Sequence, residues 1–278
     1  MSDLSALLAG TGVAVPPCRV DNHMLARVMD TSDEWIRERS GVVTRHYVEP
    51  GTSSSDLGVE AARAALADAG VEAGEVDYIV CATLTPDYYF PGIGTIVQQK
   101  LGIGAVPSLD IRQQCAGFAY GLQMVDALVR SGMARTVLLV GTDVHTSLMP
   151  FSPRTWEVLY DPEAAPLAEE ERAWNTRFRY ILVLFGDAAG AMVFRAGRED
   201  GRGILRSALW GDGNHKDILY TPGGGSAARP WVTPEMIARG DLVPVMDGRQ
   251  VFRLAVTLMP EAVRQLLADE GAAVEELD

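Results

Sequence analysis

The chain has 278 residues, of which 47% are hydrophobic and 22% are charged. This balance excludes a disordered protein and allows a large core in one domain or two. The 37 acidic and 24 basic residues give a net charge of −13, which argues against nucleic acid or an anionic membrane as the main partner. The first residues lack a basic secretory signal and no apolar run is long enough to span a membrane, so we expect a cytoplasmic protein.

The first half of the chain alternates predicted helices and strands, which indicates an α/β fold. Residues 55–70 predict a helix, because they are rich in alanine, begin with acidic residues and end at a glycine. Runs of Val, Ile and Leu predict strands at 78–83 and 106–111. A second helix is predicted over 116–130, with small residues in its first turns, and a third strand over 136–141.

The second half begins with a segment, 152–176, that breaks this alternation with three prolines and an acidic run. We interpret this segment as a surface insertion or lid. Two further apolar runs, at 180–185 and 190–194, predict strands. Residues 221–230 are rich in glycine and predict a mobile loop without the spacing of a nucleotide-binding motif.

The three cysteines, Cys18, Cys81 and Cys115, are spread singly, so neither a disulfide framework nor a cysteine zinc site is expected. Cys115 follows the predicted strand 106–111 after a short turn and starts the predicted helix 116–130. A helix N-terminus favours a reactive thiolate and stabilises an oxyanion through its free N–H groups. The local sequence also fits a buried structural cysteine, since free cysteine is among the most buried residue types.

The segment DIRQQCAGFAYGL around Cys115 resembles the nucleophile motif of the ketoacyl-acyl-carrier-protein synthase III family of thiolase-fold condensing enzymes. The blocks ATLTPDYYFPGIGTIVQQKLG before it and VLLVGTDVHTS, FGDAAGAMVF and MDGRQVFRLAV after it also appear in the family's order and spacing. This resemblance implies a thiolase-like layered α/β fold of two duplicated halves. We expect an N-terminal half over 1–176, with an insertion at 152–176, and a partial C-terminal half over 177–278.

The resemblance also implies a reaction in two steps. An acyl group from acyl-CoA moves to Cys115, and a carbanion from decarboxylation of malonyl-carrier protein then attacks the acyl-enzyme to give a β-ketoacyl thioester. Acyl-CoA is a substrate here, and neither a cofactor nor a metal is expected. The implied partners are acyl-CoA, acyl carrier protein and a second copy of the chain.

The family uses a Cys-His-Asn triad, and its His and Asn motifs normally follow a segment like the VEELD at the end of this sequence. The second half is therefore expected to be incomplete at its C-terminus. A fragment of a longer chain, a frameshifted product and a half completed by another chain all fit this pattern. We expect the four histidines present to be structural or exposed rather than substitutes; they are His23, His46, His145 and His215.

Four positions match, by resemblance, residues that bind the nucleotide part of CoA. Trp35 corresponds to a residue that stacks on adenine, with Thr31 and Arg39 near the nucleotide. Arg179 corresponds to an arginine that pairs with phosphate or stacks on the base, and the guanidinium suits both. The alternative is that Trp35 packs against the core while the arginines are solvated.

Two phenylalanines also correspond to family positions. Phe90 matches a residue that reaches across the dimer interface towards the partner's acyl pocket, and Phe252 matches one that packs near the acyl-cysteine. For both, ordinary packing in the core is the alternative.

Two other functions stay open at this point. The first is transfer of the acyl group from the cysteine to an alcohol, an amine or a second acyl-CoA, as in related enzymes of specialised metabolism. The acidic insertion fits such divergence. The second is a noncatalytic role, in which the protein binds an acyl group or a full-length homologue. This alternative stays open because the family's His and Asn are not found in the sequence.

Overall fold

The computed structural model describes residues 4–198 and 201–277 and divides the chain into two compact units. Unit 1 comprises residues 1–18, 46–145 and 186–209, and unit 2 comprises residues 19–45, 146–185 and 210–278. The predicted halves, 1–176 and 177–278, concern a duplication of the fold and stay a prediction. Their outer limits, residues 1 and 278, lie outside the described residues.

Unit 1 is built on a five-stranded mixed sheet in the order β1-β7-β6-β4-β5. Strand β4 runs parallel to β5 and β6, while β7 runs antiparallel to β1 and β6. Short parallel strands joined by helices need crossover connections, and the helices of this unit provide them. The strands are β1 (Ser5–Ala14), β4 (Tyr78–Ala82), β5 (Ser108–Ile111), β6 (Thr136–Val144) and β7 (Asp187–Gly197).

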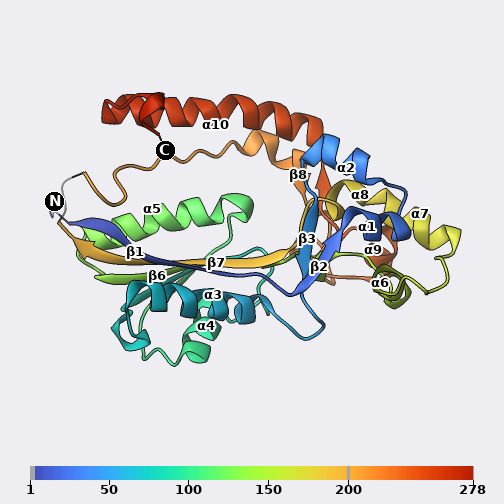
Figure 1. The fold of residues 1–278 in the computed structure, drawn as a ribbon, viewed down its shortest axis with the longest axis horizontal. Coiled ribbons are helices and arrows are strands. Elements are labelled where there is room, and N and C mark those ends of the chain that lie inside the picture. Colours follow the sequence, from blue (N-terminus) through green and yellow to red (C-terminus); the bar gives the residue numbers. More distant parts are fainter. Residues whose placement is uncertain (1–3, 199–200, 278) are drawn as a thin grey trace. The chain divides into compact units, whose positions relative to one another are not determined.

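Helices cover both faces of this sheet. Helix α3 (Ser54–Ala69) and helix α4 (Ile93–Leu101) lie on one face, and α5 (Gly117–Arg130) lies on the other (Figure 1). Neighbouring strand residues point to opposite faces, so Leu138 packs in the core under α3 while Leu139 packs in the core under α5. The predicted helices 55–70 and 116–130 are confirmed, and α5 buries one face only.

Most of the predicted strands are confirmed. The runs 78–83, 106–111, 136–141 and 190–194 coincide with β4, β5, β6 and β7. The strand predicted over 180–185 is wrong, because the chain there forms a helix, α8 (Arg179–Leu182), with Ile181 and Leu182 buried. A short apolar run fits a buried helix as well as a buried strand, and tertiary packing decided between them. Strand β1 was not predicted.

Unit 2 is mainly helical, and the insertion 152–176 forms two of its helices, α6 and α7. Residues 221–230, predicted as a loop, contain no helix or strand. The described residues include no helix long and apolar enough to cross a membrane. The helices, besides α8, are α1 (Asn22–Val28), α2 (Asp33–Ser40), α6 (Pro153–Tyr160), α7 (Glu169–Arg177), α9 (Pro234–Arg239) and α10 (Gly248–Glu270). The short strands β8 (Leu219–Tyr220) and β9 (Val245–Met246) pair antiparallel. A second pair is formed by β2 (Cys18–Asp21) and β3 (Thr44–Tyr47), at the residues where the sequence changes from one unit to the other.

The close approach of β1 to α3 gives a test of the sheet. A Cβ added at Gly12 would overlap backbone atoms of Ala61 and Ala65 on α3, so the helix would have to move. We expect Gly12→Ala to lower the free energy of unfolding by about 1–3 kcal/mol, measured by urea denaturation. Gly190→Ala in β7 is the matched control, because nothing lies within 4 Å of its added Cβ. An equal loss in both variants would contradict this account of the packing.

Candidate active site

Cys115 lies where strand β5 gives way to helix α5. Strand β5 ends at Ile111. A short 3₁₀ helix, η2 (Gln114–Ala116), contains Cys115 and leads directly into α5. The side chain of Cys115 is exposed, so the alternative of a buried structural cysteine does not apply. Because β5 is parallel to β4, this is the carboxyl edge of the parallel strands, where α/β proteins bind ligands.

The backbone around Cys115 is held in an uncommon conformation. Gln114, the residue before it, has a φ of 46°, and among the described residues no other non-glycine residue has a positive φ. Such a conformation costs energy and persists only where the surroundings impose it. The start of α5 packs closely on the sheet, since a Cβ added at Gly117 would lie 3.1 Å from the Cβ of Ala82. These two features fix the direction in which the chain presents the thiol.

The other two cysteines differ from Cys115 in exposure. Cys81 lies within strand β4 and is fully buried, and this burial raises the pKa of its thiol. Cys18 is half-buried at the start of β2. None of the three forms a disulfide.

Phe90 lies in the loop between β4 and α4, together with Tyr88 and Tyr89. All three side chains are exposed, and Phe90 is the most exposed at 79%. Packing of Phe90 in the core is therefore not its role in this structure. Three neighbouring exposed aromatic side chains are typical of a contact surface rather than of a free loop.

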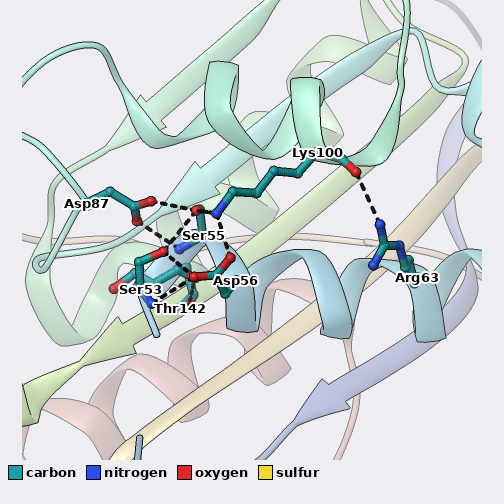
Figure 2. A network of polar contacts seen from close by, with 8 residues as sticks. Ser53, Ser55, Asp56, Arg63, Asp87, Lys100 and Thr142 are labelled. Atoms are coloured by element: carbon teal, nitrogen blue, oxygen red, sulfur yellow. Dashed lines mark hydrogen bonds and ion pairs between the residues drawn. The ribbon is translucent and has the colours of Figure 1, made fainter. Parts of the chain in front are cut away.

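A polar network anchors the start of this aromatic loop (Figure 2). Asp87 accepts hydrogen bonds from the backbone N–H of Ser55 at 2.9 Å and from its hydroxyl at 2.5 Å. Lys100, in the last turn of α4, donates to the Ser55 hydroxyl and to Asp56, each at 2.6 Å. The network therefore ties the loop to the beginning of α3 and the end of α4.

Asp56 is the electrostatic centre of this network. Burial opposes its ionisation, but hydrogen bonds from Lys100 and Ser53 outweigh that effect and lower the pKa of the carboxyl to about 2. The carboxylate is therefore ionised at neutral pH and forms an ion pair with Lys100. It also completes the capping box at the start of α3 with Ser53.

In unit 2, the structure brings three of the predicted nucleotide-binding residues together. The guanidinium carbon of Arg39 lies 4.4 Å from the centre of a Trp35 ring, and that of Arg179 lies 4.5 Å from it. Arg179 also donates a hydrogen bond to the backbone carbonyl of Asp30 at 2.6 Å and lies 3.7 Å from its carboxylate. We call Trp35, Arg39 and Arg179 the tryptophan clamp. It combines an aromatic ring system with two delocalised cations that lie over it, and both kinds of group suit a planar base and its phosphates.

Thr31 and Phe252 lie on other segments of unit 2. The hydroxyl of Thr31, four residues before Trp35, is buried and has no hydrogen-bond partner among the described residues. Phe252 lies near the start of α10 and is 69% exposed, so it does not pack as an ordinary core residue.

The four histidines lie on separate elements. His46 in β3 has its Nδ1 at 2.6 Å from the carbonyl of Pro16, which identifies Nδ1 as the donor. Burial lowers the pKa of His145, which follows β6, although Asp143 and Asp187 act in the opposite direction. His23 lies in α1, and His215 lies in a short 3₁₀ helix beside Asp212. Their structural role stays a prediction.

Sequence reasoning missed the groups that hold these sites in place. The bonds of Asp87 and Lys100 to Ser55 and the contacts of the insertion join segments far apart in the chain, and the left-handed conformation of Gln114 occurs at a residue type that does not favour it. No spacing in the sequence signals them. The one available hint is that Asp87 directly precedes the exposed aromatic residues.

Comparison with known proteins identifies close relatives of this chain. A family model described as 3-oxoacyl-[acyl-carrier-protein (ACP)] synthase III matches residues 109–165, a range that includes Cys115. The β-ketoacyl-[acyl-carrier-protein] synthase III of Rhodospirillum rubrum is 41% identical over 278 residues, covering 98% of this chain and 75% of the relative. That of Rhizorhabdus wittichii is 36% identical and also covers 98% and 75%. The solved 3-oxoacyl-(acyl carrier protein) synthase III of Pseudomonas aeruginosa matches with a TM-score of 0.78 at 35% identity, covering 98% of this chain and 73% of that structure.

The low pKa of Asp56 predicts a stability change in acid. A carboxylate whose pKa is lowered from 3.8 to about 2 stabilises the folded state above pH 4, and this contribution is lost as the pH falls towards 2. We expect Asp56→Asn to lower the Tm by about 1–3 °C at pH 6, and this difference to disappear near pH 2.

The matched control is Glu60→Gln. Glu60 is an exposed carboxylate on the same helix without an ion pair or hydrogen bond in the described part of the chain. Its effect on Tm should be small at both pH values. An Asp56→Asn difference that stays constant between pH 6 and pH 2 would argue against the ion pair as its cause.

Proposed function

The chain belongs to the β-ketoacyl-[acyl-carrier-protein] synthase III family of condensing enzymes and has their thiolase-like α/β fold, and on this premise we propose that Cys115 is its acyl-accepting nucleophile. One observation carries the proposal: among the three cysteines, Cys115 alone is exposed, and it lies at the start of α5 and the carboxyl edge of the parallel strands. Thiols at helix N-termini are activated by the helix dipole.

In the first step, the sulfur of Cys115 attacks the carbonyl carbon of an acyl-CoA thioester. The bond between that carbon and the CoA sulfur breaks, and CoA leaves as a thiol with the proton of Cys115. In the second step, a malonyl thioester of acyl carrier protein loses CO₂, and its carbanion attacks the acyl-cysteine. The β-ketoacyl thioester is released, and the Cys115 thiol is restored with a proton from solvent.

The tryptophan clamp binds the nucleotide part of CoA in this proposal. A tryptophan face stacks on a purine, and the arginines supply charge for phosphate. Thr31, whose buried hydroxyl has no hydrogen-bond partner in the described part of the chain, is proposed to lie near the nucleotide. Phe252 and Phe90, both exposed, are proposed to contact the acyl group, with Phe90 acting in the partner's pocket of a homodimer.

The same proposal assigns the protein to the cytoplasm, where free thiols stay reduced. The proposed reaction uses acyl-CoA as a substrate and needs no cofactor. The acyl chain length and acceptor vary among condensing enzymes, so transfer to an alcohol, an amine or a second acyl-CoA is the alternative second step.

The nucleophile is tested by intact-protein mass spectrometry after incubation with acetyl-CoA. We expect an acetyl adduct on the wild-type chain and its complete loss in Cys115→Ala, because only this sulfur is both exposed and at a helix start. Cys18→Ala is the matched control and should keep the adduct. An adduct that persists in Cys115→Ala would place the nucleophile elsewhere, and its absence from the wild-type chain would favour a noncatalytic homologue.

The homodimer is tested by size-exclusion chromatography with light scattering. We expect a mass about twice the chain mass of 30.0 kDa. Phe90→Asp is expected to shift the mass towards that of the monomer, because it places a charge among the exposed aromatic residues of the loop. Met133→Asp, at a position that is 70% exposed elsewhere in unit 1, is the control and should leave the mass unchanged.

A further inference from the structure

Helix α1 ends without a cap of its own. Its C-cap residue, Met29, has an extended backbone with φ −151° and ψ 165°, and no glycine follows to turn the chain. The N–H of Met29 donates to the carbonyl of Leu25 at 3.1 Å, but the later carbonyls of the last turn have no partner within the helix. Unpaired carbonyls at a partly buried helix end are costly, so other groups must supply the bonds.

Helix α7, in the insertion 152–176, supplies them. Arg172 Nη1 donates to the carbonyls of Ala26 at 3.1 Å and Arg27 at 3.2 Å. Asn175 Nδ2 donates to the carbonyl of Val28 at 3.0 Å. The Asn175 side chain is almost completely buried, with 1% exposed, and Arg172 places a cation at the negative end of the helix dipole.

The contacts continue beyond the end of α1. The N–H of Asp30 donates to the hydroxyl of Thr176 at 2.8 Å, and that hydroxyl donates to the carbonyl of Arg172 at 2.7 Å. The carbonyl of Asp30 accepts from Arg179 at 2.6 Å. The residues that follow Asp30 lead directly into α2 and Trp35.

Both sides of the tryptophan clamp are therefore attached to one helix. Ser32 caps α2 by accepting from the N–H of Trp35 at 3.1 Å, so the position of Trp35 follows from that of Asp30. Arg179 follows α7 in the chain and begins α8. A shift of α7 relative to α1 would change the distance of 4.5 Å between the Arg179 guanidinium and the Trp35 ring.

We propose that the insertion 152–176 positions the tryptophan clamp, with Arg172, Asn175 and Thr176 as positioning residues for the nucleotide part of CoA. This inference rests on the proposed role of the clamp. The three residues do not touch the ligand; they hold the end of α1 so that the clamp is ordered before the ligand arrives. Ordering a binding site in advance removes an entropic cost from binding.

The test measures the affinity of the full chain for CoA and for adenosine 3′,5′-bisphosphate by isothermal titration calorimetry. Thr176→Val removes the hydroxyl that links Asp30 to α7 and is expected to weaken the binding of both probes by about 5–30-fold. Arg172→Ala is expected to act in the same way. Thr176→Ser keeps the hydroxyl and should restore the wild-type affinity.

Arg177→Ala is the matched control. Arg177 lies on the same helix, with its guanidinium against the rings of Trp174 and Phe178 rather than against α1. The Arg177→Ala variant removes the same charge as Arg172→Ala. An equal weakening of ligand binding in both variants would therefore show a general effect of charge or of folding. That result would overturn the inference, and so would wild-type affinity in Arg172→Ala and Thr176→Val.

A double-mutant cycle separates positioning from a merely structural role. In a Trp35→Ala background, Thr176→Val should cause a smaller loss of affinity than in the wild-type chain, because one of the residues that it positions is gone. A further loss of the same size in that background would overturn the inference.

The Trp35→Ala variant alone tests the proposed function of the clamp. Wild-type affinity of Trp35→Ala for adenosine 3′,5′-bisphosphate would overturn the role of the clamp in nucleotide binding. Weaker binding by Trp35→Ala, together with wild-type affinity of Arg172→Ala and Thr176→Val, would overturn only the role of the insertion.

Discussion

Backbone groups at the ends of helices need partners, and in this chain side chains distant in sequence supply many of them. In unit 1, the carboxylate of Asp110 on β5 accepts from the N–H groups of Ile93 and Gly94 at 2.5 and 2.9 Å, and so caps α4. Asp143 at the end of β6 accepts from the N–H groups of residues 84–85 at 2.8 and 3.2 Å. These carboxylates fix both ends of the loop that carries Phe90, close to the edge of the sheet where Cys115 lies.

Unit 2 meets the same constraint at the opposite end of a helix. The last carbonyls of α1 are satisfied by Arg172 and Asn175 of the insertion, and the next residues lead to the tryptophan clamp. Phe90 shortly precedes the capped start of α4, and Trp35 follows the capped end of α1, so both proposed substrate contacts lie next to a capped helix end. The bonds that satisfy these helix ends therefore also fix the segments that carry the proposed site residues.

An element of the fold could be predicted where its own sequence contains start and stop signals, and could not where packing alone determines its structure. The helix over 55–70 carries its own start and stop signals, a capping box with Asp56 and a left-handed Gly70, so its limits could be read from the sequence. The run 180–185 carries no such signals, and its buried apolar residues folded as helix α8. Helices α6 and α7 were not predicted, because prolines and an acidic run led to the interpretation of 152–176 as an insertion. Both helices make side-chain contacts with α1, which the sequence does not indicate.

The site residues that could be predicted are those whose residue type and local sequence position indicate their chemistry. A cysteine at a strand-to-helix junction and a tryptophan in a helix start are local features. Arg172, Asn175 and Thr176 instead bond to backbone carbonyl or N–H groups that lie 145 to 147 positions away in the chain. Covalent chemistry and nucleotide binding are thereby assigned to residues of different units, Cys115 to unit 1 and the clamp to unit 2. Because the positioning bonds lie wholly within unit 2, changes there should alter ligand affinity without altering the thiol environment, and the two functions are separable by mutation.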